Sequence, residues 1–272
     1  MKGRVQEPHR RHLQFAIRLA PMTTRRDCLR RLVAALPVLP TVARAADTPV
    51  RLVATEFPPY TGSTLPGGGI ACEITRAALR QAGQSMTLSF RPWARALLEF
   101  QRGEHDGVIG TWRSAERERT MLFPPPLGIL NQVGFMCRAD HRIRVDDMSA
   151  LRGQRIGVVN GYANPERFEA AKLPVETAVD DLANLRKLLA GRVDLALIDK
   201  GVGAHLLETQ LREGAGKLVW VEPAISELPL YTVFSRTRPE GERFAAAFAR
   251  GVGDLHSNGR LAALLQQGAR WQ

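Results

Sequence analysis

The sequence predicts an α/β protein made of two lobes, and three observations support this fold class. Short apolar runs rich in β-branched residues alternate with segments of helical periodicity over residues 46–272. The alternation starts afresh after Arg138, which separates one βα set from a second. Two apolar strands, expected at 131–137 and 230–234, connect the sets, so we expect two α/β lobes joined by a two-segment hinge.

These crossings define the expected domains. Lobe 1 comprises residues 46–137 together with 236–272, and lobe 2 comprises residues 138–235 with the hinge strands at its ends. Residues 1–45 form a leader that must be set aside before the composition is interpreted. No segment after the leader has the 18 or more consecutive apolar residues of a membrane-spanning helix.

The leader has the three-part layout of a secretory signal. A basic segment, an apolar run and a small-x-small cleavage site follow one another at 24–30, 32–42 and 43–45. The paired Arg25 and Arg26 resemble a twin-arginine export signal, although Cys28 stands where this motif often has Phe. We expect export to the periplasm, by this route or another, with Met22 as the true start of the chain.

The strongly basic composition belongs mostly to this leader. The chain has a net charge of +11, but residues 1–45 contain ten of the 38 Lys and Arg and only two of the 27 Asp and Glu. The mature part therefore keeps 28 basic and 25 acidic residues, a net charge of +3. So small an excess does not indicate nucleic-acid binding.

The cysteines and histidines show no metal-ligand spacing and no catalytic set. Cys72 and Cys137 remain after the leader, and two buried free thiols are favoured over a periplasmic disulfide, which stays an alternative. Four scattered histidines are expected to be surface or capping residues: His105, His141, His205 and His256. We expect neither a metal nor another cofactor.

In the first βα set the element boundaries have local signals. Strands are predicted at 50–55, 86–90 and 131–137, and helices at 70–82 and 92–102. The prolines at 58–59 end the first strand and hold an aromatic pair in a fixed loop. Pro92 starts the second helix, which carries Trp93, Leu97 and Phe100 on one face.

The second set follows the same pattern. Strands are predicted at 155–159, 176–179, 193–198, 217–221 and 230–234, with helices starting at 164–166, after 180–181 and at 202–212. Asp180 and Asp181 are expected to cap the middle helix, which Gly191 ends. A final helical segment is broken at 257–259 and resumes.

One stretch, 103–126, carries the clearest sign of a site. An apolar strand ends at Gly110, and a charge-dense segment with Arg113, Arg117 and Arg119 follows as a short helix. Ligands bind at the carboxyl ends of the strands in open α/β sheets, and an arginine there can bind a carboxylate through two parallel hydrogen bonds. The alternative is that these arginines form a solvated helix face.

At this point the chain resembles a known family, the periplasmic solute-binding proteins of the polar amino-acid type, solute-binding family 3, over residues 48–271. The resemblance rests on ordered blocks: RLVATEFPPY, EITRAALRQAG, FRPWARALLEFQRGEHDGVIG, SAERERTMLFPPPL, LRGQRIGVVNG, LAGRVDLALID and LHSNGRLAALLQQGARW. It implies two Rossmann-like α/β lobes of the type II periplasmic binding-protein kind, which close on a ligand in the cleft.

The resemblance also implies a set of binding residues. The family's carboxylate-binding arginine corresponds to Arg117, six residues before Phe123, and its amine-binding aspartate corresponds to Asp199, after GRVDLALI. The two belong to different lobes, so a ligand carrying both charges is held only after closure. Phe57 matches the aromatic residue that packs on the ligand, and the turn at 160–164 is expected to offer backbone N–H groups to an anion.

The chain departs from the family by having fewer hydroxyl groups and more aromatic rings. Gly110 and Trp112 flank Thr111 where a serine or threonine is usual, and Tyr162 with Ala163 replaces a usual threonine. This favours a flat, cationic or larger ligand stacked between rings. Core packing for some rings, and an ion pair or cap for the charges, are the alternatives. The candidate ligand-binding residues are Glu56, Phe57, Tyr60, Trp93, Thr111, Trp112, Arg117, Asn160, Tyr162 and Asp199.

Three functions remain open at this stage. The first is a non-catalytic, monomeric periplasmic receptor that delivers a small amino-acid-like solute to an inner-membrane ABC permease. The second is an enzyme resembling cyclohexadienyl dehydratases, for which Glu56 and Asp199 are the carboxylates at the cleft lip. The third is a sensory or accessory binding protein without an importer.

Overall fold

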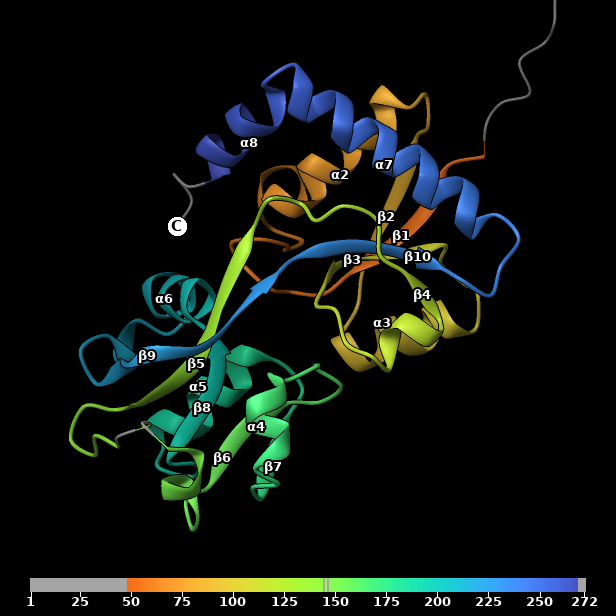
Figure 1. Ribbon diagram of the computed structural model, residues 1–272. Coiled ribbons are helices and arrows are strands. Elements are labelled where there is room, and N and C mark those ends of the chain that lie inside the picture. Colours follow the sequence, from red (N-terminus) through yellow and green to blue (C-terminus); the bar gives the residue numbers. More distant parts are fainter. Residues whose placement is uncertain (1–47, 144, 146, 269–272) are drawn as a thin grey trace, which may run out of the picture. The chain divides into compact units, whose positions relative to one another are not determined.

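A computed structural model describes residues 48–143, 145 and 147–268 (Figure 1). The predicted leader, with Met22, the paired arginines and Cys28, lies outside these residues. Within them, no helix combines the length and apolar character needed to cross a bilayer. The described chain contains two mixed sheets of five strands each, which confirms the α/β class. The strand predicted at 131–137 within the first set pairs in the second sheet.

The first sheet contains strands from both ends of the described chain, in the order β2-β1-β3-β10-β4. Its strands are β1 (Val50–Ala54), β2 (Met86–Phe90), β3 (Gly107–Thr111), β4 (Met121–Leu122) and β10 (Tyr231–Ser235). β1 runs parallel to β2 and β3, whereas β10 runs antiparallel to β3 and β4. Four of the five side chains of β1 are buried, as a strand covered on both faces requires.

The second sheet has the order β7-β6-β8-β5-β9. Its strands are β5 (Leu130–Arg138), β6 (Ile156–Val159), β7 (Val175–Ala178), β8 (Leu195–Asp199) and β9 (Leu218–Pro229). β6 runs parallel to β7 and β8, and β5 runs antiparallel to β8 and β9. The chain enters this sheet between β4 and β5 and leaves it between β9 and β10, so two segments connect the sheets (Figure 1).

Helices accompany both sheets (Figure 1). They are α2 (Ile70–Gln81), α3 (Trp93–Gln101), α7 (Gly241–Ser257) and α8 (Arg260–Gly268) beside the first sheet, and α4 (Glu166–Ala170), α5 (Asp181–Leu189) and α6 (Lys200–Thr209) beside the second. Helix α7 packs closely on α2 because Gly251 has no side chain; a Cβ atom at this position would lie 1.9 Å from the Ala78 carbonyl oxygen. The end of the described chain thus returns to the sheet with which it begins.

Three elements differ from the prediction. The strand predicted at 217–221 continues to Pro229, because β9 pairs with β5 along a shifted register and lies at a sheet edge, where prolines are tolerated. The helix predicted at 202–212 is α6, which begins at Lys200 because the Asp199 carboxylate caps it. The short helix predicted after β3 is a single 3₁₀ turn, Arg117–Arg119.

The two cysteines are as predicted. Cys72 and Cys137 are both buried and both free. Burial raises the pKa of the Cys72 thiol to about 12, so this thiol stays protonated and unreactive at physiological pH.

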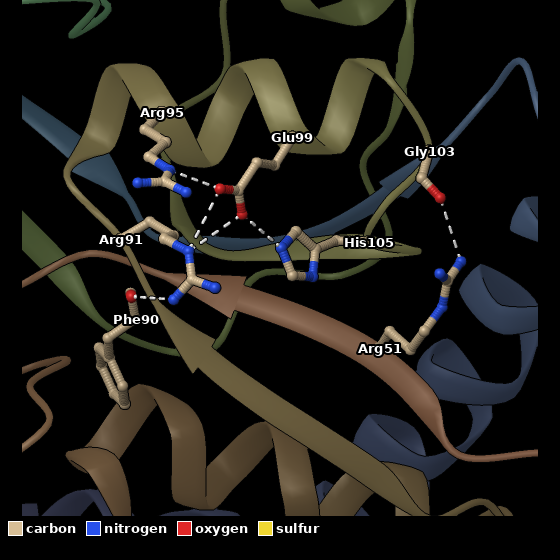
Figure 2. Close-up of polar contacts among 7 residues, drawn as sticks. All are labelled: Arg51, Phe90, Arg91, Arg95, Glu99, Gly103 and His105. Carbon is tan, nitrogen blue, oxygen red and sulfur yellow. Dashed lines mark hydrogen bonds and ion pairs between the residues drawn. The ribbon is translucent and has the colours of Figure 1, made fainter.

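One histidine prediction is wrong, and Figure 2 shows why. His105 is buried, and its Nε2 atom lies 3.0 Å from the Glu99 carboxylate. The same carboxylate, only 6% exposed, accepts hydrogen bonds from Arg95 Nε at 2.6 Å and Arg91 Nε at 3.1 Å. Glu99, Arg91, Arg95 and His105 form what we call the Glu99 cluster, which links Arg91, directly after β2, to the α3 residues Arg95 and Glu99.

Candidate functional site

A small pocket lies where the loops after β1, β3 and β6 meet. We call it the Arg117 pocket; its lining is Thr55, Phe57, Trp93, Gly110, Trp112, Arg117, Tyr162 and Ala163. Tyr162 and Ala163 follow β6 of the second sheet, and the other residues belong to the lobe of the first sheet. The pocket is therefore at the carboxyl ends of parallel strands, the position at which α/β proteins bind ligands.

Arg117 is a buried cation without a carboxylate partner among the described residues. Its side chain donates from Nη1 to the Trp112 carbonyl oxygen at 2.8 Å and from Nη2 to the Gly161 carbonyl oxygen at 3.0 Å. The guanidinium carbon lies 5.0 Å from the ring centre of Trp93. Burial lowers the pKa of Arg117 to about 10. The two carbonyl groups accept hydrogen bonds but carry no negative charge, so the charge of Arg117 is uncompensated and the pocket favours an anion.

Tyr162 fills the space between three aromatic rings of the other lobe. Its ring centre lies 5.6 Å from that of Trp112, 5.9 Å from that of Trp93 and 6.1 Å from that of Phe57, all in edge-to-face geometry. The cavity volume left in the pocket is about 10 Å³, which is room for one water. A ligand in this position therefore has to displace the Tyr162 ring.

Asp199 lies at a buried polar junction next to this pocket. It ends β8, is 1% exposed, and accepts a hydrogen bond from the Val202 backbone N–H at 2.9 Å. Its other oxygen, Oδ2, is buried and has no hydrogen-bond partner among the described residues. Burial raises the pKa of Asp199 to about 6, although the Val202 amide and the nearby Tyr60 hydroxyl and Asn131 amide lower it.

Asn131 connects this junction to the aromatic rings. It is fully buried in β5, and its Oδ1 atom accepts a hydrogen bond from Trp112 Nε1 at 2.8 Å. Tyr60 is buried as well, and its hydroxyl pKa is raised well above the usual value by burial and then by the Asp199 charge. Tyr60 and Asp199 are thus brought together beside the pocket, without forming part of its lining.

Three predicted residues lie apart from the Arg117 pocket. Glu56 is exposed, and both of its carboxylate oxygens lie 3.1 Å from the Ser63 N–H group, which donates to them. Thr111 is fully buried in β3, and its hydroxyl has no partner among the described residues. Asn160 is exposed.

The turn after β6 presents a carbonyl group to the pocket, and two of its backbone N–H groups are already used within the second lobe. The Asn160 N–H donates to the Ala178 carbonyl oxygen, and the Tyr162 N–H donates back within the turn. The Gly161 carbonyl oxygen instead accepts from Trp93 Nε1 at 2.7 Å and from Arg117. Gly161 has a φ of +79°, which is the left-handed region that favours glycine.

The glycine at 110 has a comparable explanation. Its φ is +86°, a conformation that a serine or threonine adopts only with strain. The loss of a hydroxyl side chain at this position is therefore linked to the backbone path from β3 to Trp112.

Sequence reasoning missed two buried polar residues. Asn131 was treated only as the first residue of an apolar strand, and Asp181 only as a helix cap. The cap is Asp180, whose Oδ1 atom accepts from the Ala183 N–H at 2.7 Å, while Asp181 is 2% exposed and accepts from the Tyr162 hydroxyl at 2.9 Å. The sequence does contain one signal for Asp181: a helix start needs a single capping carboxylate, and Asp180 already supplies it.

The sequence matches the family described as bacterial extracellular solute-binding proteins, family 3, over residues 52–268. No protein with a curated description matches the chain. Within the described ranges no group of three or more His, Cys, Asp or Glu side chains is arranged to hold a metal ion.

Solved structures share the fold at low sequence identity. A histidine kinase sensor domain with similarity to periplasmic binding proteins has a TM-score of 0.72 at 20% identity, covering 83% of this chain and 96% of that one. The arginine-, lysine- and histidine-binding protein ArtJ of Geobacillus stearothermophilus has a TM-score of 0.68 at 19% identity, covering 82% and 94%. The substrate-binding protein of an amino acid ABC transporter has a TM-score of 0.66 at 18% identity, covering 82% and 98%.

Proposed function

The chain belongs to the bacterial extracellular solute-binding proteins of family 3, and from this premise we propose that it is an exported receptor whose two lobes close on a small amino-acid-like solute. The receptor is monomeric, performs no chemistry, and delivers the solute to an inner-membrane ABC permease. One observation carries the proposal: Arg117 is a buried cation between the two lobes that lacks a carboxylate partner among the described residues.

The environment of Arg117 supports a carboxylate as the missing partner. A buried guanidinium is expensive when its charge is not neutralised, and a carboxylate accepts two parallel hydrogen bonds from it. The present acceptors are the Trp112 and Gly161 carbonyl groups. The second acceptor comes from the other lobe, so a ligand carboxylate that binds Arg117 meets a group that both lobes already share.

Asp199 supports a positive group on the same ligand. Its unpartnered Oδ2 atom is buried close to the Tyr60 hydroxyl and Asn131. An ammonium group in this position returns the aspartate to its charged form and supplies the missing donor. A zwitterion held by Arg117 in one lobe and Asp199 in the other needs both lobes, so its binding favours the closed state.

The structural neighbours agree with an amino-acid-like solute and a transport partner. One serves an amino acid ABC transporter, and another binds arginine, lysine and histidine. At 18% and 19% identity they support the class of ligand without naming it.

The test is a thermal-shift screen of the mature protein against amino acids, polyamines and small organic acids. A ligand at 100 times its Kd raises the free energy of unfolding by about 2.7 kcal/mol, roughly 5–10 °C in midpoint for a chain of this size. Arg117→Ala should abolish the shift, whereas Arg119→Ala, which changes an exposed arginine of the same turn, should keep it. A shift of equal size in Arg117→Ala refutes the assignment of Arg117.

A sensory role without an importer is the second candidate, because the histidine kinase sensor domain shares this fold. It predicts the same ligand binding but a different cellular readout. Deleting the gene should stop uptake of the radiolabelled ligand if the protein serves a permease, and should leave uptake unchanged while removing a transcriptional response if it serves a sensor.

A further inference from the structure

A second buried carboxylate, Asp181, lies beside the Arg117 pocket and is not explained by the fold. It is the first residue of α5, but the cap of this helix is Asp180. Asp181 is 2% exposed, and its Oδ2 atom accepts a hydrogen bond from the Tyr162 hydroxyl at 2.9 Å. Its Oδ1 atom is buried and has no hydrogen-bond partner among the described residues.

The Tyr162 side chain connects Asp181 to the pocket. Its ring lies among Phe57, Trp93 and Trp112, and its hydroxyl ends on the carboxylate. The Tyr162 ring thus fills the space between these three rings, and its hydroxyl donates a hydrogen bond to one of the two Asp181 carboxylate oxygens. A ligand that displaces Tyr162 from the rings also uncovers this carboxylate.

A cavity of about 540 Å³ adjoins the other side of Asp181. Three carboxylates line it, those of Glu56, Asp180 and Asp181, together with His205, and no lysine or arginine does. Asp180 and Glu56 already accept backbone N–H groups, from Ala183 and Ser63 respectively. Asp181 is the member of this set with a buried oxygen that lacks a partner.

We propose that Asp181 binds a second positive group of the ligand, an ammonium or guanidinium, which replaces the Tyr162 hydroxyl. This rests on the proposed function and narrows the ligand to a cationic amino acid or a close analogue. A hydrogen bond between a cation and a carboxylate is stronger than one from a neutral phenol.

The experiment compares two probes of nearly the same shape, L-arginine and L-citrulline, by calorimetric titration of the mature protein. Citrulline has an uncharged ureido group in place of the guanidinium, so the ratio of the two affinities isolates the second charge. Wild type should prefer arginine by about 30-fold or more, and Asp181→Asn should reduce this preference to about threefold or less. Asp140→Asn, a change of an exposed carboxylate, should leave the ratio unchanged.

Tyr162→Phe provides a second, milder variant in case Asp181→Asn fails to fold. It removes the competing hydroxyl and keeps the ring, so arginine affinity should rise by about two- to tenfold while citrulline affinity changes little. Equal effects on both probes would mean that the pair between Tyr162 and Asp181 is only structural.

The outcomes separate this inference from the receptor function. The inference is overturned if Asp181→Asn keeps the wild-type preference, or if a neutral or acidic amino acid binds wild type while arginine, lysine and ornithine do not. In either case loss of that binding in Arg117→Ala leaves the receptor function standing. If no amino acid, polyamine or organic acid binds wild type, both fail.

Discussion

The Glu99 cluster and the cleft around Arg117 both contain buried charged groups, but the partners of these groups differ. In the Glu99 cluster the carboxylate has three nitrogen partners, with His105 and then Arg95 as the main causes that lower its pKa to about 2. In the cleft, Arg117 has only carbonyl acceptors among the residues that the structure describes, and burial raises the pKa of Asp199 to about 6 and that of Asp181 to about 7.

This difference in partners distinguishes charges that stabilise the fold from charges that we expect to bind a ligand. A buried ion that is fully paired within the fold stabilises a particular arrangement of elements, here the corner before Trp93. A buried ion left unpaired costs free energy in the free protein, and that cost is recovered when a partner of opposite charge arrives. Each prediction below changes one side of this comparison.

The largest effect is expected from removing the cleft charge. Asp199→Asn should weaken binding of the cognate ligand by about 30-fold or more, because it leaves the ligand's ammonium group buried without a counter-charge. Calorimetric titration measures the change. An affinity within about threefold of wild type would show that Asp199 serves only as the cap of α6.

A change in the Glu99 cluster should lower stability and leave ligand affinity unchanged. Glu99→Gln leaves Arg91, Arg95 and His105 without their shared anion, so the midpoint of thermal unfolding should fall. The ligand affinity should stay close to that of wild type, because none of the four cluster residues lines the Arg117 pocket. Loss of affinity without loss of stability would place this cluster in the binding site.

The cleft carboxylates should also make the stability of the free protein depend on pH. Asp181 is faced by Asp180, Asp199 and the Tyr162 hydroxyl, and burial keeps its folded pKa, about 7, above the unfolded value of 3.8. Its contribution to stability is therefore fully present below about pH 4 and is lost as the pH rises through 7.

Denaturant titrations between pH 4 and 8 measure this dependence. In Asp181→Asn the free energy of unfolding should fall less over this range than it does in wild type. Identical slopes in the two proteins would mean that Asp181 is already ionised in the free state.

The smallest effect is expected at Thr111, whose buried hydroxyl has no partner among the described residues. Thr111→Val replaces that hydroxyl with a methyl group of similar shape, so stability should change by less than about 1 kcal/mol or rise. Ligand affinity should be unchanged. A large loss of affinity would restore Thr111 to the binding site.

The sequence predicts most of the fold because local signals and periodicity agree. β2 matches its predicted range, and Pro92 starts α3 as expected. β9 could not be predicted in full, because its second half depends on pairing with β5 across a shifted register, while its prolines and glutamates read locally as a loop.

The site, too, was predictable only in part from the sequence. The family resemblance implies Arg117 and Asp199 as binding residues, and Phe57, Trp93, Trp112 and Tyr162 line the Arg117 pocket together with Arg117. The roles of Asn131 and Asp181 depend on which buried groups lie within hydrogen-bonding distance after folding, and no local pattern encodes that. The Gly161 carbonyl group that faces Arg117 likewise depends on the folded path of the turn after β6.

The central claim is that the unpaired carboxylates of the cleft bind a positively charged ligand. Its most direct test is the number of protons released when the ligand binds. It is obtained by titrating L-arginine into the mature protein at pH 6.5 in buffers of different ionisation enthalpy. Since Asp181 and Asp199 are partly protonated in the free protein, arginine should bind with net proton release. The release should decrease above pH 8 and in Asp181→Asn. Binding of arginine without proton release at pH 6.5 would contradict the account.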